Sequence, residues 1–221
     1  RLNDRDFFWP PILQTFLILK RLAPSEAARV AERIRAIQVP DAFRSRPPAN
    51  WASVWLSGEW LRVREGLSPY TIDDIDAWVA PFFEVHSDIP GGYYQEPGHP
   101  NSYDVFTRYH LTLMLVEGYA GAYKSQIEEW LLPGVRRSLA VQLSDGSLAS
   151  AYRSTGQSWT LGCQMAYLTM AANLLSARGE EEWAERARAA VRLSQASFAL
   201  WQRPDGPYSP VQNLLPWSYR V

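Results

Sequence analysis

The segment from Gly91 to His110 (GGYYQEPGHPNSYDVFTRYH) combines side chains that transfer protons with rings that stack on ligands. It places His99 in a Gly-His-Pro loop, Tyr103 where an apolar helix is expected to begin, and His110 seven residues further on. His and Tyr are common general acids and bases. We therefore expect this segment to form the rim of a binding cleft, with these three residues as proton-transfer candidates. For His110 the alternative is a buried histidine with a structural role.

A second set of candidates lies in other loops, and its chemistry suits an anionic ligand. Arg153 lies in a Ser-rich loop and, with Arg108 or Arg5, can bind a carboxylate through two parallel hydrogen bonds. Asn50 can donate a hydrogen bond to a developing enolate and joins the catalytic candidates. The alternative for Asn50 and Asp104 is a helix N-cap. The expected substrate-binding residues are Arg153, Trp51, Tyr94, Glu96, Asp104, Tyr152 and Trp159.

The chain is rich in aromatic residues, with ten Trp and eleven Tyr among 221 residues. A flat ring offers an apolar face to the C–H groups of a sugar, while Tyr O–H and Trp N–H add polar contacts. The same rings also fill hydrophobic cores. The composition therefore leaves both interpretations open.

Charge, cysteine content and motifs argue against several classes of protein. The net charge of −1 gives no overall field that would attract nucleic acid or an anionic membrane. The single Cys163 excludes an internal disulfide and a cysteine zinc cluster. Apolar stretches of roughly a dozen residues are too short to span a bilayer. The sequence has no GxSxG, P-loop, GxGxxG or HExxH motif, so we expect no cofactor and no bound metal.

Apolar residues recur at helical spacing, and no β alternation is sustained. Segments 25–39, 71–83 and 180–201 are amphipathic, as expected for helices with one buried face. A second group is apolar nearly all round, as expected for helices buried on every side. This group comprises segments 7–22, 50–63, 103–119 and 158–175. The two kinds alternate with a period of roughly 50 residues, which indicates a structural repeat.

This alternation predicts an all-α fold of repeated helical hairpins, each with one buried and one surface helix. Such hairpins form an (α/α) toroid, and four of them fit in 221 residues. A closed toroid uses about six, so we expect an incomplete arc. The chain (1–221) is then a single toroid-like domain and a piece of a longer protein. A plain orthogonal helical bundle is the alternative.

The long, polar, aromatic loops all lead into the buried helices, at one end of such an arc. The loops at the opposite end, such as KRLAPSE and EGLSPYT, are shorter and plainer. A cleft that binds a ligand needs this asymmetry. We therefore place the candidate site at the starts of the buried helices.

Four stretches of the chain resemble a known family. They are DRDFFWPPILQTFLILKRL, the Asn50-Trp51 pair, DGSLASAYRSTGQSW and YDVFTRYH, and they look like the bacterial family called domain of unknown function 2264. More distantly, they are similar to the toroid domains of heparinase-type and alginate-type polysaccharide lyases. The resemblance implies an (α/α) toroid and a role with acidic polysaccharides.

The chain also departs from both groups. It reads AYRS where the first family usually has a GRS-type stretch. It has Asn50 alone where lyases often have a paired Asn or an Asn-His, and its 221 residues include no β-sandwich domain.

Together these features predict an enzyme that cleaves a uronate-containing polysaccharide or oligosaccharide by β-elimination. The first alternative is hydrolysis of the unsaturated-glucuronyl hydrolase type, whose toroid is related. Hydrolysis needs two carboxylates, and the available ones are Asp4, Asp6, Glu96, Asp104 and Asp145. The second alternative is a non-catalytic carbohydrate-binding module. None of these three hypotheses involves nucleic acid or a membrane as a partner.

The start of the sequence has no signal-peptide segment, which slightly favours the cytoplasm. A chain that begins inside a longer protein would leave its location undetermined. The sequence does not determine an oligomeric state.

Overall fold

The computed structural model describes residues 8–38, 50–85, 87–88, 93–95, 101–149, 154 and 156–210. The elements are α1 (Trp9–Leu22), α2 (Pro24–Arg35), α3 (Asn50–Arg64), α4 (Ile72–Val85), β1 (Ser87–Asp88), β2 (Tyr93–Tyr94), α5 (Asn101–Val116), α6 (Lys124–Glu129), α7 (Leu131–Val141), α8 (Ser158–Ala177) and α9 (Glu181–Ala199). None of the described helices combines the length and apolar character needed to cross a membrane.

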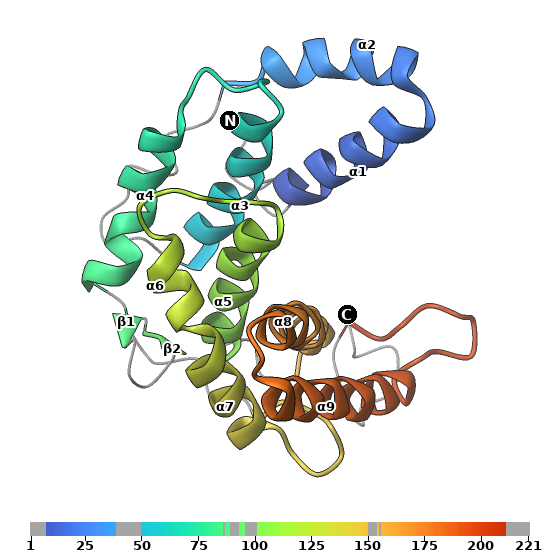
Figure 1. Ribbon diagram of the computed structural model, residues 1–221. Helices are drawn as coiled ribbons and strands as arrows, with labels where there is room; N and C mark the ends of the chain where they lie inside the picture. Colours follow the sequence, from blue (N-terminus) through green and yellow to red (C-terminus); the bar gives the residue numbers. More distant parts are fainter. Residues whose placement is uncertain are drawn as a thin grey trace.

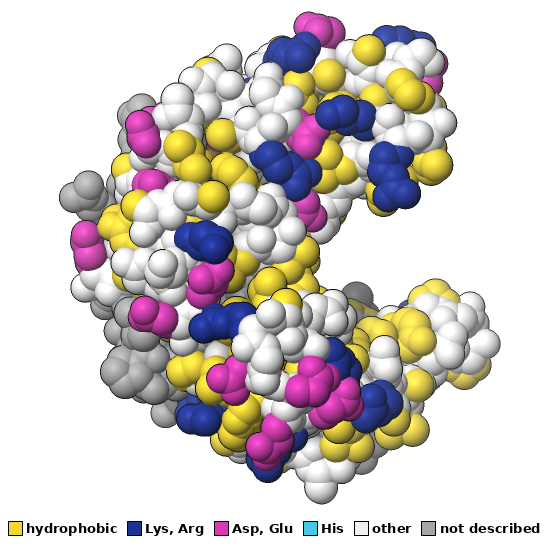
Figure 2. Space-filling model, viewed as in Figure 1, with side chains coloured by type: hydrophobic (Ala, Val, Ile, Leu, Met, Phe, Trp, Pro, Cys, Tyr) yellow, Lys and Arg dark blue, Asp and Glu magenta, His cyan; other side chains and the backbone are white. Residues whose placement is uncertain are grey.

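The helices form four hairpins arranged along an arc (Figure 1). The hairpins are α1–α2, α3–α4, α5 with α6 and α7, and α8–α9. Helices α1, α3, α5 and α8 pack one against the next as the inner row. The molecule has a C-shaped outline, open between the α1–α2 arm and the α8–α9 arm (Figure 2). The expected all-α arc of (α/α)-toroid type is confirmed.

Three hydrophobic clusters join each hairpin to the next. The first combines α1, α2 and α3 and includes Leu13, Ile34 and Leu61. The second combines α3, α4, α5 and α6, and the third combines α5, α7, α8 and α9. Helices α3 and α5 each contribute to two clusters, so they are buried on opposite faces. This double burial explains why their sequences are apolar nearly all round.

Helix α1 departs from the expectation that its apolar sequence is buried on every side. Trp9, Leu13 and Phe16 are buried. Four other large apolar residues on or next to this helix are exposed: Phe8 (61%), Ile12 (44%), Ile18 (57%) and Leu22 (79%). The cause is position, because α1 is the end of the inner row among the described helices and its main contacts with them are to α3 and α2.

The outer helix of the third hairpin gave no clear amphipathic signal in the sequence. It consists of two short helices, α6 and α7, that meet at Trp130. Pro133 and Gly134 follow in the first turn and a half of α7. The first four N–H groups of a helix need no helical partner, so Pro133 is tolerated there. The interruption and the Pro-Gly pair conceal the helical period.

Helix α4 begins with a capping box. The carboxylate of Asp74 accepts hydrogen bonds from the Thr71 backbone N–H (2.8 Å) and hydroxyl (3.0 Å). These bonds satisfy donors at the helix start, where acidic groups are also favoured by the helix dipole.

Short antiparallel hairpins follow the outer segments α4, α7 and α9. The paired residues are Ser87–Tyr94 and Asp88–Tyr93 after α4, Gln142–Leu148 after α7, and Gln202–Tyr208 after α9. The first two hairpins precede the inner helices α5 and α8 in the chain, and they lie at the end of the arc where those helices begin.

The contact between α1 and α3 depends on a glycine and provides a test of the packing. A Cβ atom at Gly58 would lie 2.5 Å from Trp9 Cδ1 and 3.0 Å from the Pro10 backbone nitrogen. We expect Gly58→Ala to lower the free energy of unfolding by about 1–3 kcal/mol, because overpacking forces the helices apart. Urea unfolding followed by circular dichroism measures this change.

Gly162 in α8 is the matched control, because a Cβ atom there meets no atom of the described residues within 4 Å. Gly162→Ala should raise the free energy of unfolding by about 0.5–1 kcal/mol through helix propensity alone. Equal effects of the two substitutions would contradict the close contact of α1 with α3.

Candidate functional site

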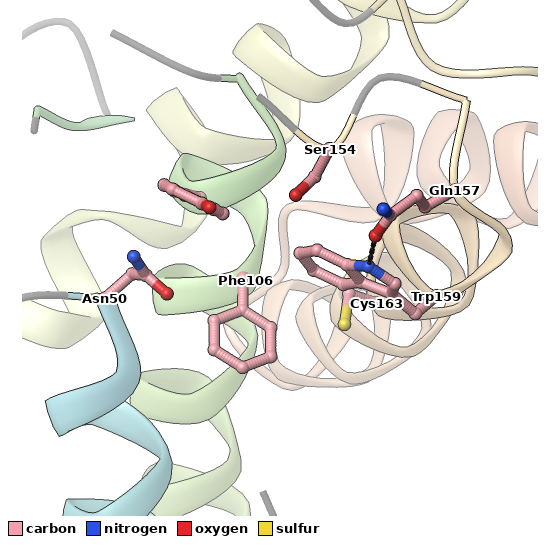
Figure 3. A pocket seen from close by; sticks show the side chains of 7 residues that line it. Asn50, Phe106, Ser154, Gln157, Trp159 and Cys163 are labelled. Atoms are coloured by element: carbon pink, nitrogen blue, oxygen red, sulfur yellow. Dashed lines mark hydrogen bonds between the residues drawn. The ribbon is translucent and has the colours of Figure 1, made fainter. Parts of the chain in front are cut away.

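A pocket of about 340 Å³ lies where three inner helices begin (Figure 3). Its lining residues are Asn50, Tyr103, Phe106, Ser154, Gln157, Trp159 and Cys163. Asn50 is the first residue of α3, Tyr103 is in the first turn of α5, and Gln157 directly precedes α8. The volume is in the range of sites for small ligands. The pocket therefore occupies the end of the arc at which the sequence places the candidate site.

Helix starts shape the electrostatics of this pocket. A helix N-terminus carries partial positive charge and backbone N–H groups that favour an anion. At the start of α8, one of these backbone N–H groups already binds an acceptor of the protein itself. The Ser158 backbone N–H donates to the carbonyl of Pro210 (3.0 Å), and the Ser158 hydroxyl donates to the carbonyl of Ser209. The hairpin after α9 thus caps the start of α8.

The described lining is aromatic and polar but contains no Asp, Glu, Lys, Arg or His. The Trp159 side chain is 37% exposed, and its indole N–H donates to the Gln157 side-chain oxygen (Figure 3). The Trp159 ring meets the buried Phe106 ring edge to face, with centroids 5.3 Å apart. These contacts hold a partly exposed indole beside amide groups, an arrangement suited to a sugar ring.

Ser154 contributes the one strained backbone position described at the pocket. Its φ of 65° is in the left-handed region, which costs a non-glycine residue about 1–2 kcal/mol. Strained residues often occur in binding loops held by surrounding structure. The conformation places Ser154 in the lining.

His110 is buried behind the pocket and does not line it. Its Nδ1 lies 2.9 Å from the Ser57 hydroxyl, and its ring contacts Phe106 and Tyr109. Burial lowers the pKa of His110 to about 3, so its imidazole is neutral near pH 7. The structure thus places His110 in the core position considered as its alternative, in contact with the lining residue Phe106.

Asp104 and Arg108 form a buried ion pair within α5. Arg108 donates from Nε (2.9 Å) and Nη2 (2.8 Å) to the two carboxylate oxygens of Asp104. Its Nη1 donates to the Gly134 carbonyl and the Ser138 hydroxyl, both at 3.0 Å. Asp104 also accepts from the backbone N–H of the buried Tyr94 (2.9 Å). Arg108 is therefore committed to the interior and is not available as a carboxylate clamp.

The remaining candidates are distributed as follows. Trp51 is 41% exposed but is not part of the pocket lining. Of the expected site residues, Asn50, Tyr103 and Trp159 come together in the pocket, while Asp104, Tyr94 and His110 are buried outside its lining. Seven candidates lie outside the described residues: Asp4, Arg5, Asp6, Glu96, His99, Tyr152 and Arg153.

Four lining residues were not among the expected catalytic or substrate-binding residues, namely Phe106, Ser154, Gln157 and Cys163. The sequence does place Ser154 and Gln157 in the polar loop before the fourth buried helix. Helical spacing offers a signal for the other two, because Phe106 follows Tyr103 by three positions and Cys163 follows Trp159 by four. Burial raises the pKa of the Cys163 thiol to about 12. This thiol is protonated at neutral pH and is a structural part of the wall.

Among the described residues, no group of three or more His, Cys, Asp or Glu side chains is arranged to hold a metal ion.

An arc of helical hairpins with a pocket at the N-termini of the inner helices defines the (α/α)-toroid class. The sequence alone supplies no closer assignment, since no family model and no curated protein matches it. The resemblance to domain of unknown function 2264 therefore stays a prediction.

Two solved structures share this fold. One is a glycosyl hydrolase family 88 protein from Bacteroides vulgatus, with a TM-score of 0.61, 14% identity and coverage of 92% of this chain and 64% of that chain. The other is a polysaccharide lyase, with a TM-score of 0.57, 14% identity and coverage of 91% of this chain and 62% of that chain. This chain thus spans less than two thirds of either structure. At this identity the similarity shows the fold, which both carbohydrate-active proteins share with this chain.

The buried ion pair leads to a stability prediction. We expect Arg108→Met to lower the free energy of unfolding by about 3–5 kcal/mol, because it leaves the Asp104 carboxylate buried without its cation. Asp104→Asn should be destabilising for the reciprocal reason. Urea unfolding of the two single variants and the double variant measures the coupling. The double variant should lose less than the sum of the single losses, and a strictly additive result would contradict the pairing.

His110 leads to a pH prediction. Its folded pKa of about 3 is below the unfolded value of 6.5, so the unfolded state binds more protons between these values. The stability contributed by neutral His110 is present above pH 6.5 and is lost as pH falls toward 3, by about 2 kcal/mol between pH 8 and pH 5. Urea unfolding at these pH values, with His110→Gln as the comparison, measures this loss. An equal pH dependence in the variant would show that His110 is not the titrating group.

Proposed function

We propose that this chain acts on a uronate-containing polysaccharide or oligosaccharide and cleaves it by β-elimination. The observation that carries the proposal is the pocket itself, in which the partly exposed Trp159 ring lies with Asn50 and Tyr103 at the starts of inner helices. A sugar ring can stack on the indole while its carboxylate meets amide and helix N–H donors. The similarity in fold to a polysaccharide lyase supports the proposal.

The reaction assigns a role to each residue. The proton at C5 of the uronate is removed, the bond between C4 and the glycosidic oxygen breaks, and a double bond forms between C4 and C5. The departing oxygen takes up a proton and leaves as a hydroxyl group of the other product. The Asn50 amide would donate to the carboxylate and stabilise the enolate as it develops. Tyr103 would transfer the proton, since it lies in the lining.

Two further candidates keep their expected roles in this proposal. Arg153, which precedes the lining residue Ser154 in the sequence, would clamp the carboxylate, and His99 would assist in proton transfer. His110 has no assigned role, because it is buried and is not part of the described pocket lining. Membership in the family of domain of unknown function 2264 is part of the same proposal.

Hydrolysis is the second candidate, and the fold similarity to a glycosyl hydrolase family 88 protein favours considering it. Hydrolysis needs two carboxylates about 5–5.5 Å or about 6.5–9.5 Å apart. The described lining contains none. Asp104 is paired with Arg108, and Asp145 accepts hydrogen bonds from Ser147 in a turn. Asp4, Asp6 and Glu96 lie outside the described residues. Elimination is the first candidate because Asn50 and Tyr103, the residues that it would use, are in the described lining.

The test is absorbance near 235 nm, where the unsaturated uronate product absorbs, with a panel of uronic-acid polysaccharides and oligosaccharides. We expect an increase with the wild type and a loss of at least about 100-fold in kcat for Asn50→Ala, because an enolate-stabilising donor is removed. Trp159→Ala should mainly raise KM, since it removes a stacking surface.

Asn173→Ala is the matched control, because Asn173 is an exposed asparagine on α8 outside the pocket lining. It should leave both kinetic constants unchanged. New reducing ends without an increase in absorbance near 235 nm would show that the reaction is hydrolysis and that the elimination proposal is wrong. If calorimetry shows that the oligosaccharide binds but neither the unsaturated product nor new reducing ends form, the chain is a carbohydrate-binding module and the proposal of an enzyme is wrong.

A further inference from the structure

A continuous series of side-chain contacts crosses the three inner helices that form the pocket. It begins in α8, where the Trp159 indole N–H donates to the Gln157 side-chain oxygen (Figure 3). It passes into α5 through the Phe106 ring, whose centroid is 5.3 Å from that of Trp159 and 4.6 Å from that of His110. It ends in α3, where the Ser57 hydroxyl lies 2.9 Å from His110 Nδ1. Direct contacts thus connect the exposed wall of the pocket to the buried core.

Trp159 needs this support because of its position. It is the second residue of α8 and is 37% exposed. An exposed side chain usually exchanges among rotamers, and an indole can stack on a sugar only while its face is turned to the ligand. Phe106 meets the indole edge to face, with an angle of 77° between the ring planes. Because Phe106 is itself buried, it restrains the exposed ring.

His110 supports Phe106 in the same manner. The two residues are four positions apart on α5 and are therefore neighbours on one face of the helix. Their rings also meet edge to face, at 77°. Burial lowers the pKa of His110, so its imidazole is neutral near pH 7. A neutral ring packs against Phe106 without the cost of a buried charge.

The hydrogen bond to Ser57 defines the orientation of the His110 ring. The Ser57 hydroxyl donates its one hydrogen to the Val54 carbonyl (3.0 Å). Its oxygen is then the acceptor for His110 Nδ1–H. This assignment places the proton of the neutral imidazole on Nδ1. The ring therefore has one preferred orientation relative to α3.

The same bond aligns two pocket residues. Asn50 precedes Ser57 by seven positions, and Tyr103 precedes His110 by seven. Seven residues are about two helical turns, so each pair lies on one face of its helix. Because α3 and α5 both begin at the pocket, the bond sets Asn50 level with Tyr103. Hydrophobic contacts are not directional, whereas a buried hydrogen bond specifies one register of the two helices.

Two other bonds join α3 to the far end of α5. Trp60 Nε1 and Arg64 Nη1 donate to the Glu117 carbonyl, at 3.1 Å and 3.2 Å. Glu117 directly follows the last residue of α5. Of these described bonds, the one between Ser57 and His110 is the nearest to the pocket, so it has the most direct effect on the helix starts.

We propose that His110 is a positioning residue of the pocket and acts by two routes. Its hydrogen bond to α3 keeps Asn50 level with Tyr103, the residues that would stabilise the enolate and transfer the proton. Its ring, through Phe106, holds the Trp159 indole in the plane on which the sugar stacks. The uronate sugar rests on the proposed function, whereas the positioning of these side chains does not depend on it.

Two substitutions of His110 separate the routes. His110→Asn keeps an N–H donor at the same number of bonds from Cα as Nδ1 but removes the ring, and His110→Phe keeps a ring but removes the donor. We expect His110→Asn to shift the ¹⁹F NMR signal of Trp159 and to leave that of Tyr103 unchanged. His110→Phe should do the reverse. The measurement uses the 221-residue chain labelled with fluorotryptophan or fluorotyrosine, and Trp159→Phe and Tyr103→Phe assign the signals.

Ser194→Ala is the matched control. It also removes a buried hydroxyl that bonds across the fold, here to the Gly146 carbonyl (2.9 Å), and it should shift neither signal. The inference is overturned if both His110 variants shift the same signal, if neither variant shifts any signal, or if the control shifts them equally.

Two further variants keep the test valid if a first variant does not fold. His110→Gln also removes the ring and should shift the Trp159 signal. Ser57→Ala also removes the bond between α3 and α5 and should shift the Tyr103 signal. The absence of either shift overturns the inference.

Kinetics connect the inference to the reaction. With a uronate substrate that the wild type cleaves, His110→Phe should lower kcat at least about 10-fold with KM nearly unchanged, because the reacting groups lose their alignment. His110→Asn should raise KM about 2- to 10-fold with kcat nearly unchanged, because stacking contributes to binding. An equal loss of kcat in both variants overturns the inference. If no uronate is cleaved, the proposed function is wrong, and the ¹⁹F signals alone decide whether His110 positions the pocket.

Discussion

The buried ion pair between Asp104 and Arg108 is the interaction on which the central part of the arc depends. Arg108 connects α5 to α7 through Gly134 and Ser138, and its guanidinium lies 4.4 Å from the centre of the Tyr167 ring in α8. A buried charge pair is tolerated only when its remaining donors and acceptors are also satisfied. These contacts constrain the rotation of α5 about its axis, and this rotation places Tyr103 and Phe106 in the pocket.

The same pair explains the character of the pocket. Because Arg108 and Asp104 satisfy each other in the interior, neither contributes charge to the described lining. The described lining offers an indole, a phenol, amides and helix starts. Such a surface suits a ligand with an apolar ring face and a polar or anionic edge. Chemistry there would depend on oriented dipoles and on Tyr103 more than on charged side chains.

The architecture is modular, and its modules meet through close contacts. Gly58 lets α1 approach α3, and Gly146 lets α9 rest on the hairpin after α7. Each hairpin of helices thus completes the core of the one before it. The pocket lies in the middle of the row, where α3 and α5 have neighbours on both sides.

The sequence by itself determined the helical class, the alternation of inner and outer helices and the end of the arc that carries the pocket. These features follow from local spacing, because a helix buried on two faces must be apolar nearly all round. It also indicated Asn50, Tyr103 and Trp159 as residues of one site. Only the tertiary structure decided which polar groups are used internally. Ser57 meets His110 across 53 positions, and Arg108 meets Gly134 across 26. Local periodicity carries no information on such partners, because they are chosen by how the helices pack.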